Sequence, residues 1–218
     1  MVTEPNFAAM RAAMVENQLR TSDVNDVRVI AAMAQVPREA FVPVTRQAMA
    51  YIDRPVPLAD GRALNPPLAT GRLLTEAAVR RGEKVLLVGA ATGYTAALLA
   101  AMGAQVTAVD DAALLTPDGT SSVAPLAGVT LAPGTLAGGA PANGPYAVII
   151  IDGAIEEVPG ALVEQLGDGG RMATGLIDKG VTRLAIGRKS GDAFGLTHVA
   201  DIEMVVLPGF ARPKTFVF

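Results

Sequence analysis

Two glycines and two carboxylates stand where a ligand of the nucleoside class would need them. Gly89 and Gly93 bracket a turn that follows the apolar run of residues 84–88. Glycine tolerates positive φ and has no Cβ, so the backbone of such a turn can approach a ligand closely. Asp110, seventeen residues after Gly93, ends a second apolar run. This spacing is typical of an acid that accepts hydrogen bonds from ribose hydroxyls. It favours a nucleoside cofactor without saying which one.

Each of these residues also has a purely structural interpretation. A glycine turn between a strand and a helix can serve packing alone, and Asp110 can cap the helix that follows. Asp152 ends a further apolar run, residues 145–151. Its carboxylate is equally consistent with orienting a cofactor amine and with capping a turn.

Strands and helices alternate around these residues. Apolar runs predict parallel strands at 84–88, 105–109, 128–132, 145–152 and 171–176, and helical periodicity predicts helices at 7–20, 26–36, 70–80, 95–100, 111–115 and 157–166. Asp23 or Asn25 is a plausible N-cap for the second helix. Residues 181–188 and 196–206 mix polar with apolar side chains, as an antiparallel pair at a sheet edge does. We therefore expect a doubly wound α/β fold, mostly parallel, with helices on both faces, a helical N-terminal extension and an antiparallel C-terminal edge.

Residues 37–67 are expected to form a rigid, irregular surface loop, because prolines interrupt every possible helix or central strand. These are Pro37, Pro43, Pro55, Pro57, Pro66 and Pro67. Long ordered loops are more often functional than not. The predicted organisation is a region of N-terminal helices and proline-rich loop, residues 1–80, packed on a core of residues 81–218 as one compact unit.

Composition excludes several classes of function. Of the 218 residues, 50% are hydrophobic and 18% are charged, which allows a sizeable core. A net charge of −3 argues against a nucleic-acid partner that needs a broad basic face. The absence of cysteine excludes thiolate nucleophiles and zinc–sulfur sites, and the single His198 does not anchor a metal by itself. No metal site is expected.

The uncharged stretch of residues 85–109 is long enough to cross a bilayer, but glycines break it and its period changes midway. No signal peptide is visible in the first 20 residues. We expect a soluble cytoplasmic protein without a membrane partner.

The order of these segments resembles the protein-L-isoaspartate O-methyltransferase family, a branch of the class I S-adenosylmethionine-dependent methyltransferases. The resemblance covers nearly the whole chain, and the Val-Pro-Arg-x-x-Phe-Val-Pro string is its most specific part. It rests on Met14-Val-x-Asn-Gln-Leu-Arg20, Val36-Pro-Arg-Glu-Ala-Phe-Val-Pro43, Ala50-Tyr-Ile-Asp53, the strand and turn of residues 85–94, Glu157-Val-Pro-x-Ala-Leu-x-Glu-Gln-Leu166, Gly169-Gly-Arg171 and the ending at residues 207–218.

The resemblance implies a Rossmann-like methyltransferase that methylates the α-carboxylate of isoaspartyl residues in a protein or peptide substrate, as a monomer or homodimer. Its implied cofactor is S-adenosylmethionine, with S-adenosylhomocysteine as product. The implied cofactor-binding residues are Gly89, Ala90, Ala91, Thr92, Gly93, Tyr94, Asp110, Asp111, Thr135, Leu136 and Asp152. Arg62 and Asn65 are the implied catalytic residues, because they stand in the family's substrate loop and offer hydrogen-bond donors to a carboxylate.

Several positions depart from the family's pattern. Leu87 and Ala91 stand where the cofactor turn normally has an acid and a glycine, and Thr135 stands where an acid near the adenine is frequent. Arg62 and Asn65 replace a glutamine and a serine, and Arg62 can also be read as a solvated loop charge. An α-carboxylate is ionised at neutral pH, so the chemistry needs alignment rather than a catalytic base. The alternative is a non-catalytic homologue that acts as a nucleoside-binding or protein-interaction module.

Overall fold

The structure is a computed structural model that describes residues 5–58, 61–115 and 126–212. Its centre is a seven-stranded sheet of order β5-β4-β3-β6-β7-β8-β9. The strands are β3 (Lys84–Val88), β4 (Gln105–Val109), β5 (Val129–Leu131), β6 (Tyr146–Ile155), β7 (Leu166–Asp178), β8 (Val181–Ser190) and β9 (Ala193–Asp201). Pairing is parallel from β5 to β7 and antiparallel from β7 to β9. The doubly wound sheet with an antiparallel C-terminal edge is confirmed.

The helices lie at the positions that the periodicity indicated, with different ends. They are α1 (Phe7–Met14), α2 (Val27–Gln35), α3 (Pro67–Ala77), α4 (Tyr94–Ala101), α5 (Ala112–Leu115) and α6 (Gly160–Glu164). A π-helical turn, Val15–Leu19, extends α1. The helix predicted at 157–166 is wrong in length, because Pro159 precedes its first turn and β7 already begins at Leu166. Among the described residues, no helix has the length and apolar content that crossing a membrane requires.

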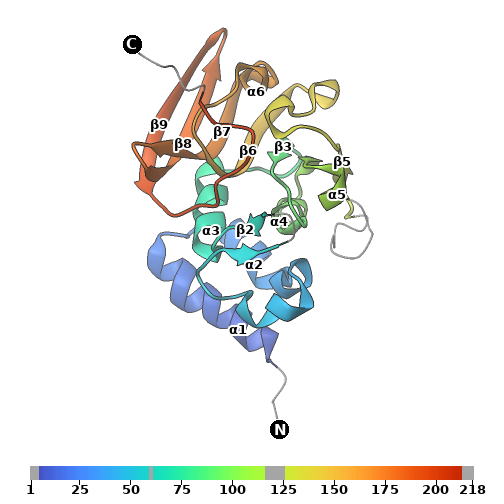
Figure 1. The fold of residues 1–218 in the computed structure, drawn as a ribbon, viewed down its shortest axis with the longest axis vertical. Helices are drawn as coiled ribbons and strands as arrows, with labels where there is room; N and C mark the ends of the chain where they lie inside the picture. Colours follow the sequence, from blue (N-terminus) through green and yellow to red (C-terminus); the bar gives the residue numbers. More distant parts are fainter. Residues whose placement is uncertain (1–4, 59–60, 116–125, 213–218) are drawn as a thin grey trace.

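Alternate residues of β3 pack into two different core clusters, one on each face of the sheet. Val85 and Leu87 belong to the cluster that includes side chains of α1 to α4. Leu86 and Val88 belong to the other, which includes side chains of α6 and of the C-terminal segment. The period of two in a strand therefore explains why all four of these side chains are buried. The N-terminal helices lie at one end of the molecule and the β8–β9 edge lies at the other (Figure 1).

The proline-rich segment contains more regular structure than expected. It forms two 3₁₀ turns, Arg38–Phe41 and Val44–Met49, and a small hairpin of β1 (Val56–Pro57) and β2 (Ala63–Leu64). The prediction of an irregular loop is wrong for these residues. Strands of two residues carry no usable periodicity, and proline is compatible with an edge strand.

Asp26 caps α2, so the prediction of Asp23 or Asn25 as the N-cap is wrong. The Asp26 carboxylate accepts a hydrogen bond from the Arg28 N–H at 2.8 Å, whereas Asp23 adopts a left-handed conformation (φ 62°) before the helix begins. The Arg28 guanidinium then reaches the Val79 carbonyl at 2.6 Å. Hydrogen bonding to Arg28 lowers the pKa of Asp26. The start of α2 is thereby tied to the residues that follow α3.

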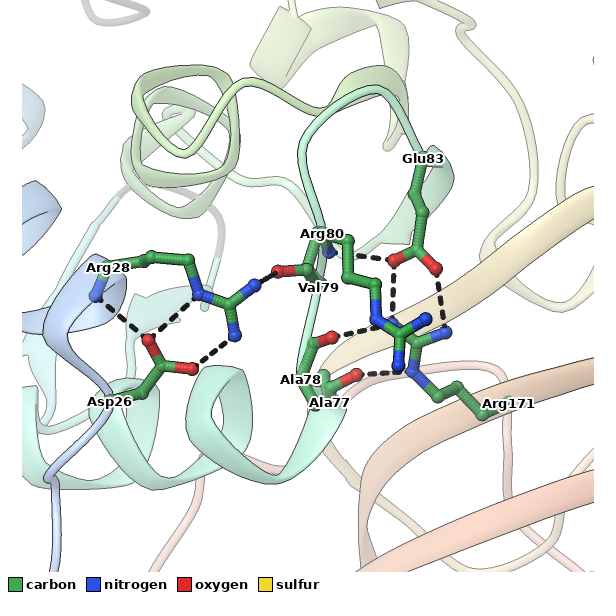
Figure 2. A network of polar contacts seen from close by, with 8 residues as sticks. All are labelled: Asp26, Arg28, Ala77, Ala78, Val79, Arg80, Glu83 and Arg171. Carbon is green, nitrogen blue, oxygen red and sulfur yellow. Dashed lines mark hydrogen bonds and ion pairs between the residues drawn. The ribbon is translucent and has the colours of Figure 1, made fainter.

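Arg171 of β7 holds the carboxyl end of α3 (Figure 2). Its Nε donates to the Ala77 carbonyl at 2.5 Å and its Nη2 to the Ala78 carbonyl at 2.8 Å. Glu83 accepts two hydrogen bonds from the same guanidinium, at 3.1 and 2.7 Å. Burial acts to raise the pKa of Glu83, but the hydrogen bonds from Arg171 and from a backbone N–H outweigh it and lower the pKa. A cation on the last carbonyls of a helix is favourable, so this contact fixes α3 against the sheet.

Candidate active site

The predicted ligand-binding residues meet at the carboxyl edge of the parallel strands. The turn of residues 89–93 follows β3, Asp110 follows β4, and Asp152 lies in β6, and β4 and β6 flank β3. Gly89 and Gly93 have φ values of 83° and 93°, which an L side chain rarely adopts. The expectation that glycine is needed at both ends of this turn agrees with the backbone that the structure shows.

Ala91 occupies the middle of the turn in a left-handed conformation, with φ at 48°. Such a conformation costs a residue other than glycine about 1–2 kcal/mol. The Ala91 N–H donates to Asp110 Oδ2 at 2.7 Å, and the residue is 3% exposed. The turn therefore keeps a glycine-like backbone at a position that holds alanine. The carboxylate of Asp110 is one of the contacts that stabilise it.

Asp110 is fully buried, and its two oxygens already accept four hydrogen bonds. Oδ1 accepts from Arg62 Nη1 at 2.5 Å and from the Asp111 N–H at 2.9 Å. Oδ2 accepts from Arg62 Nη2 at 2.8 Å and from the Ala91 N–H. Arg62 and Asp110 thus form a bidentate ion pair in which the two side chains are 8% and 0% exposed. The interpretation of Arg62 as a solvated loop charge is wrong.

The buried Asn65 and the partly buried Asp152 form a second cluster beside the turn. The Asn65 Nδ2 donates to the Asp152 carboxylate at 2.8 Å and to its carbonyl at 3.0 Å, while Asn65 Oδ1 accepts from the Val205 N–H at 2.8 Å. Thr95 Oγ1 donates to the other Asp152 oxygen at 2.5 Å. Burial raises the pKa of Asp152, against the opposing effect of the hydrogen bonds from Thr95 and Asn65. The amide of Asn65 is therefore occupied by Asp152 rather than open to a substrate.

Sequence reasoning did not assign Arg38, which holds three parts of the site together. Its Nε donates to the Ala50 carbonyl at 2.7 Å, its Nη2 donates to the Asn65 carbonyl at 2.6 Å, and its guanidinium lies 4.8 Å from the centre of the Tyr94 ring. Burial lowers the pKa of Arg38. The available signal was its place in the Val36-Pro-Arg string, which pointed to a family but not to a contact. Thr95 was missed for a simpler reason, since a threonine at the start of a helix carries no functional signal by itself.

Thr135 and Leu136 also lie near the carboxyl edge of the sheet, whereas Leu87 lies within a strand. The Asp110 carbonyl accepts from the Gly134 N–H at 3.1 Å, which brings the exposed Thr135 and the buried Leu136 next to it. Leu87 is fully buried in the middle of β3. No group of three His, Asp or Glu side chains within the described residues is arranged to hold a metal ion.

The chain is similar in sequence to one family of known proteins over most of its length. The sequence profile described as Protein-L-isoaspartate(D-aspartate) O-methyltransferase (PCMT) matches residues 9–208. The chain is 35% identical over 205 residues to a protein-L-isoaspartate O-methyltransferase of Koribacter versatilis (strain Ellin345), with 93% of this chain and 92% of the relative covered. It is 36% identical over 201 residues to the protein of the same name from Methylorubrum populi, with 91% and 95% covered.

Two solved structures share the fold. A protein titled protein-L-isoaspartate O-methyltransferase gives a TM-score of 0.77 at 20% identity, over 91% of this chain and 66% of that one. A putative protein-L-isoaspartate O-methyltransferase from Plasmodium falciparum, in complex with S-adenosyl-L-homocysteine, gives 0.70 at 17% identity, over 94% and 99%. These likenesses confirm the expected fold class.

Proposed function

Since the chain belongs to the protein-L-isoaspartate(D-aspartate) O-methyltransferase family, we propose that it transfers the methyl group of S-adenosylmethionine to the α-carboxylate of isoaspartyl residues in proteins or peptides. The observation that carries the proposal is the meeting of the 89–93 turn with Asp110 at one sheet edge, in a chain that matches the family from residue 9 to 208. This arrangement supports a nucleoside cofactor lying over the turn with its ribose at Asp110.

The residue types at this sheet edge are suited to the binding of S-adenosylmethionine. Gly89 and Gly93 allow the turn to approach a ligand, and the Asp110 carboxylate is the acceptor that two ribose hydroxyls require. One contact opposes the fit, because Arg62 already holds both oxygens of Asp110. Leu207 also lies against the turn, so that a Cβ added to Gly89 would meet its Cδ1 at 3.0 Å. The cofactor is accommodated only when Arg62 has left Asp110.

When bound, S-adenosylmethionine supplies an electrophilic methyl group on a sulfonium. The protein then has to align a carboxylate and to exclude water, since an α-carboxyl has a pKa of about 3.5 and is already ionised at neutral pH. We assign to Asn65 the positioning of Asp152 and of the segment around Val205, which it bridges. Arg62 is the candidate donor to the substrate carboxylate, and its planar fork suits that group once it is free of Asp110.

Methyl transfer to matched peptides tests the proposal. A peptide with one isoaspartyl residue is expected to accept a methyl group from S-adenosylmethionine, and the same peptide with a normal aspartyl residue is not. Equal incorporation into both peptides leaves a methyltransferase without the repair specificity. If neither peptide accepts a methyl group and calorimetry detects no heat with millimolar S-adenosylhomocysteine, the non-catalytic alternative replaces the proposal.

A further inference from the structure

Arg62 reaches the cofactor acid from a small, separate part of the fold. It lies between the Gly61 turn and β2, on a hairpin whose two strands have two residues each. The Leu58 N–H donates to the Arg62 carbonyl at 2.8 Å, so the backbone of Arg62 belongs to the hairpin, while its guanidinium lies on Asp110, 48 residues further along the chain. Movement of the Arg62 side chain therefore changes what Asp110 contacts.

The contact is incompatible with the role of Asp110 as ribose acceptor. Four N–H groups, two of them from Arg62, already point at the two oxygens of a carboxylate that has about four acceptor positions. A ribose diol would bring two further donors. The two contacts from the Ala91 and Asp111 N–H groups belong to the backbone around the site, so the two from Arg62 are the ones that a ligand can replace.

We propose that Arg62 is a latch on the cofactor site, which binds Asp110 in the closed form and must leave it before the ribose hydroxyls can bind. This inference rests on the proposed function, because it takes the ligand to be a nucleoside cofactor. The apparent affinity for the cofactor then equals the affinity of the open form multiplied by the fraction of molecules whose latch is open. Arg62 therefore weakens cofactor binding in the free protein.

The surroundings of Arg62 allow it to open. The side chain keeps 8% exposure, and its Nε has no hydrogen-bond partner among the described residues. The neighbouring Gly61 has φ at 72°, and a Cβ added there would meet nothing within 4 Å. The backbone next to Arg62 is therefore not packed against other residues at Gly61, and the guanidinium can exchange the carboxylate of Asp110 for another anion when the side chain moves.

Calorimetric titration with S-adenosylhomocysteine tests the latch without depending on methyl transfer. We expect Arg62→Ala and Arg62→Gln to bind S-adenosylhomocysteine at least tenfold more tightly than the unchanged protein. Arg54→Ala is the matched control, since it removes an exposed arginine from the same segment, and its dissociation constant is expected to equal that of the unchanged protein. Thermal unfolding of each variant shows that it is folded, and Arg62→Gln carries the test if the alanine variant is not.

The outcomes separate this inference from the proposed function. Equal or weaker binding by both Arg62 variants, in a protein that does bind S-adenosylhomocysteine, overturns the latch and leaves the methyltransferase proposal intact. Absence of binding by the unchanged protein together with clear binding by the Arg62 variants supports a latch that is almost always closed. Absence of binding by every variant overturns both proposals together.

Discussion

The variant Leu87→Glu tests whether residue 87 serves the apolar core or the proposed cofactor turn of residues 89–93. Leu87 is fully buried in β3, opposite Ala108 of β4 and Ile150 of β6. Loss of the buried leucine costs about 1.5–3 kcal/mol. A glutamate in its place would lie within the apolar core, so it is expected to be protonated in the folded protein. Protonating a group of pKa about 4.3 at pH 7 costs about 3.7 kcal/mol, at about 1.36 kcal/mol per pH unit.

The two contributions add to about 5–7 kcal/mol, which is comparable with the whole free energy of unfolding of many domains. The cost of protonating the introduced glutamate increases as the pH rises. Folding would raise the pKa of the carboxyl introduced at position 87, so the protonated form favours the folded state, and stability is lost as pH rises above the ordinary glutamate value. Between pH 7 and pH 5 the deficit of Leu87→Glu is expected to shrink by about 2.7 kcal/mol.

Urea unfolding at pH 7 and pH 5 measures both quantities, with Leu87→Met as the control that conserves volume. The methionine variant is expected to lose less than about 1.5 kcal/mol, without dependence on pH. One result refutes the reasoning. If Leu87→Glu unfolds at the same urea concentration as the unchanged protein and binds S-adenosylhomocysteine more tightly, the new carboxylate has reached the turn, and Leu87 is a lost ligand-binding position rather than core.

Three further outcomes follow from the site and the α3 contact. Asp110→Ala leaves the Arg62 guanidinium buried without its carboxylate, so unfolding experiments are expected to show a loss of about 3 kcal/mol or more, together with weaker nucleoside binding by calorimetry. Ala91→Gly relieves a left-handed alanine and is expected to raise the midpoint of thermal unfolding, by a net gain of up to about 1 kcal/mol; a lower midpoint contradicts this. Glu83→Gln is expected to cost about 1–2 kcal/mol at pH 7. Because the pKa of Glu83 is lowered, that difference should fade as pH drops through the lowered value, which urea unfolding at pH 7 and pH 3 checks.

The sheet was predictable because its signal is repeated at every strand. Each central strand is a short apolar run, and a parallel strand buried on both faces needs such a run. The meeting of the 89–93 turn, Asp110 and Asp152 followed from the same topology, since parallel strands place their carboxyl ends at one edge. The hairpin of β1 and β2 was missed, because two residues per strand give no period to read.

The partner of Arg62 was beyond sequence reasoning for a physical reason. An ion pair between residues 48 positions apart depends on where the hairpin lies over the sheet, and nothing in local propensity sets that position. The sequence singled out this arginine as a candidate donor to a substrate carboxylate, and the structure shows that its side chain is buried. Its partner, however, is Asp110, the residue that we propose as the ribose acceptor.

Two of the residues that depart from the family's pattern, Arg62 and Ala91, are connected in the structure through one carboxylate. Arg62 and Ala91 both contact the carboxylate of Asp110, one through its guanidinium and the other through its N–H. Asp110 accepts a hydrogen bond from Ala91, whose backbone is left-handed, and forms an ion pair with Arg62. A ligand that displaces Arg62 therefore also changes the net charge next to the turn. Buried contacts that share one carboxylate are not additive. The combined variant Arg62→Gln with Ala91→Gly should therefore differ from the sum of the two single effects on S-adenosylhomocysteine affinity measured by calorimetry. Leu87→Met, which changes only a side chain of the apolar core, should combine additively with both.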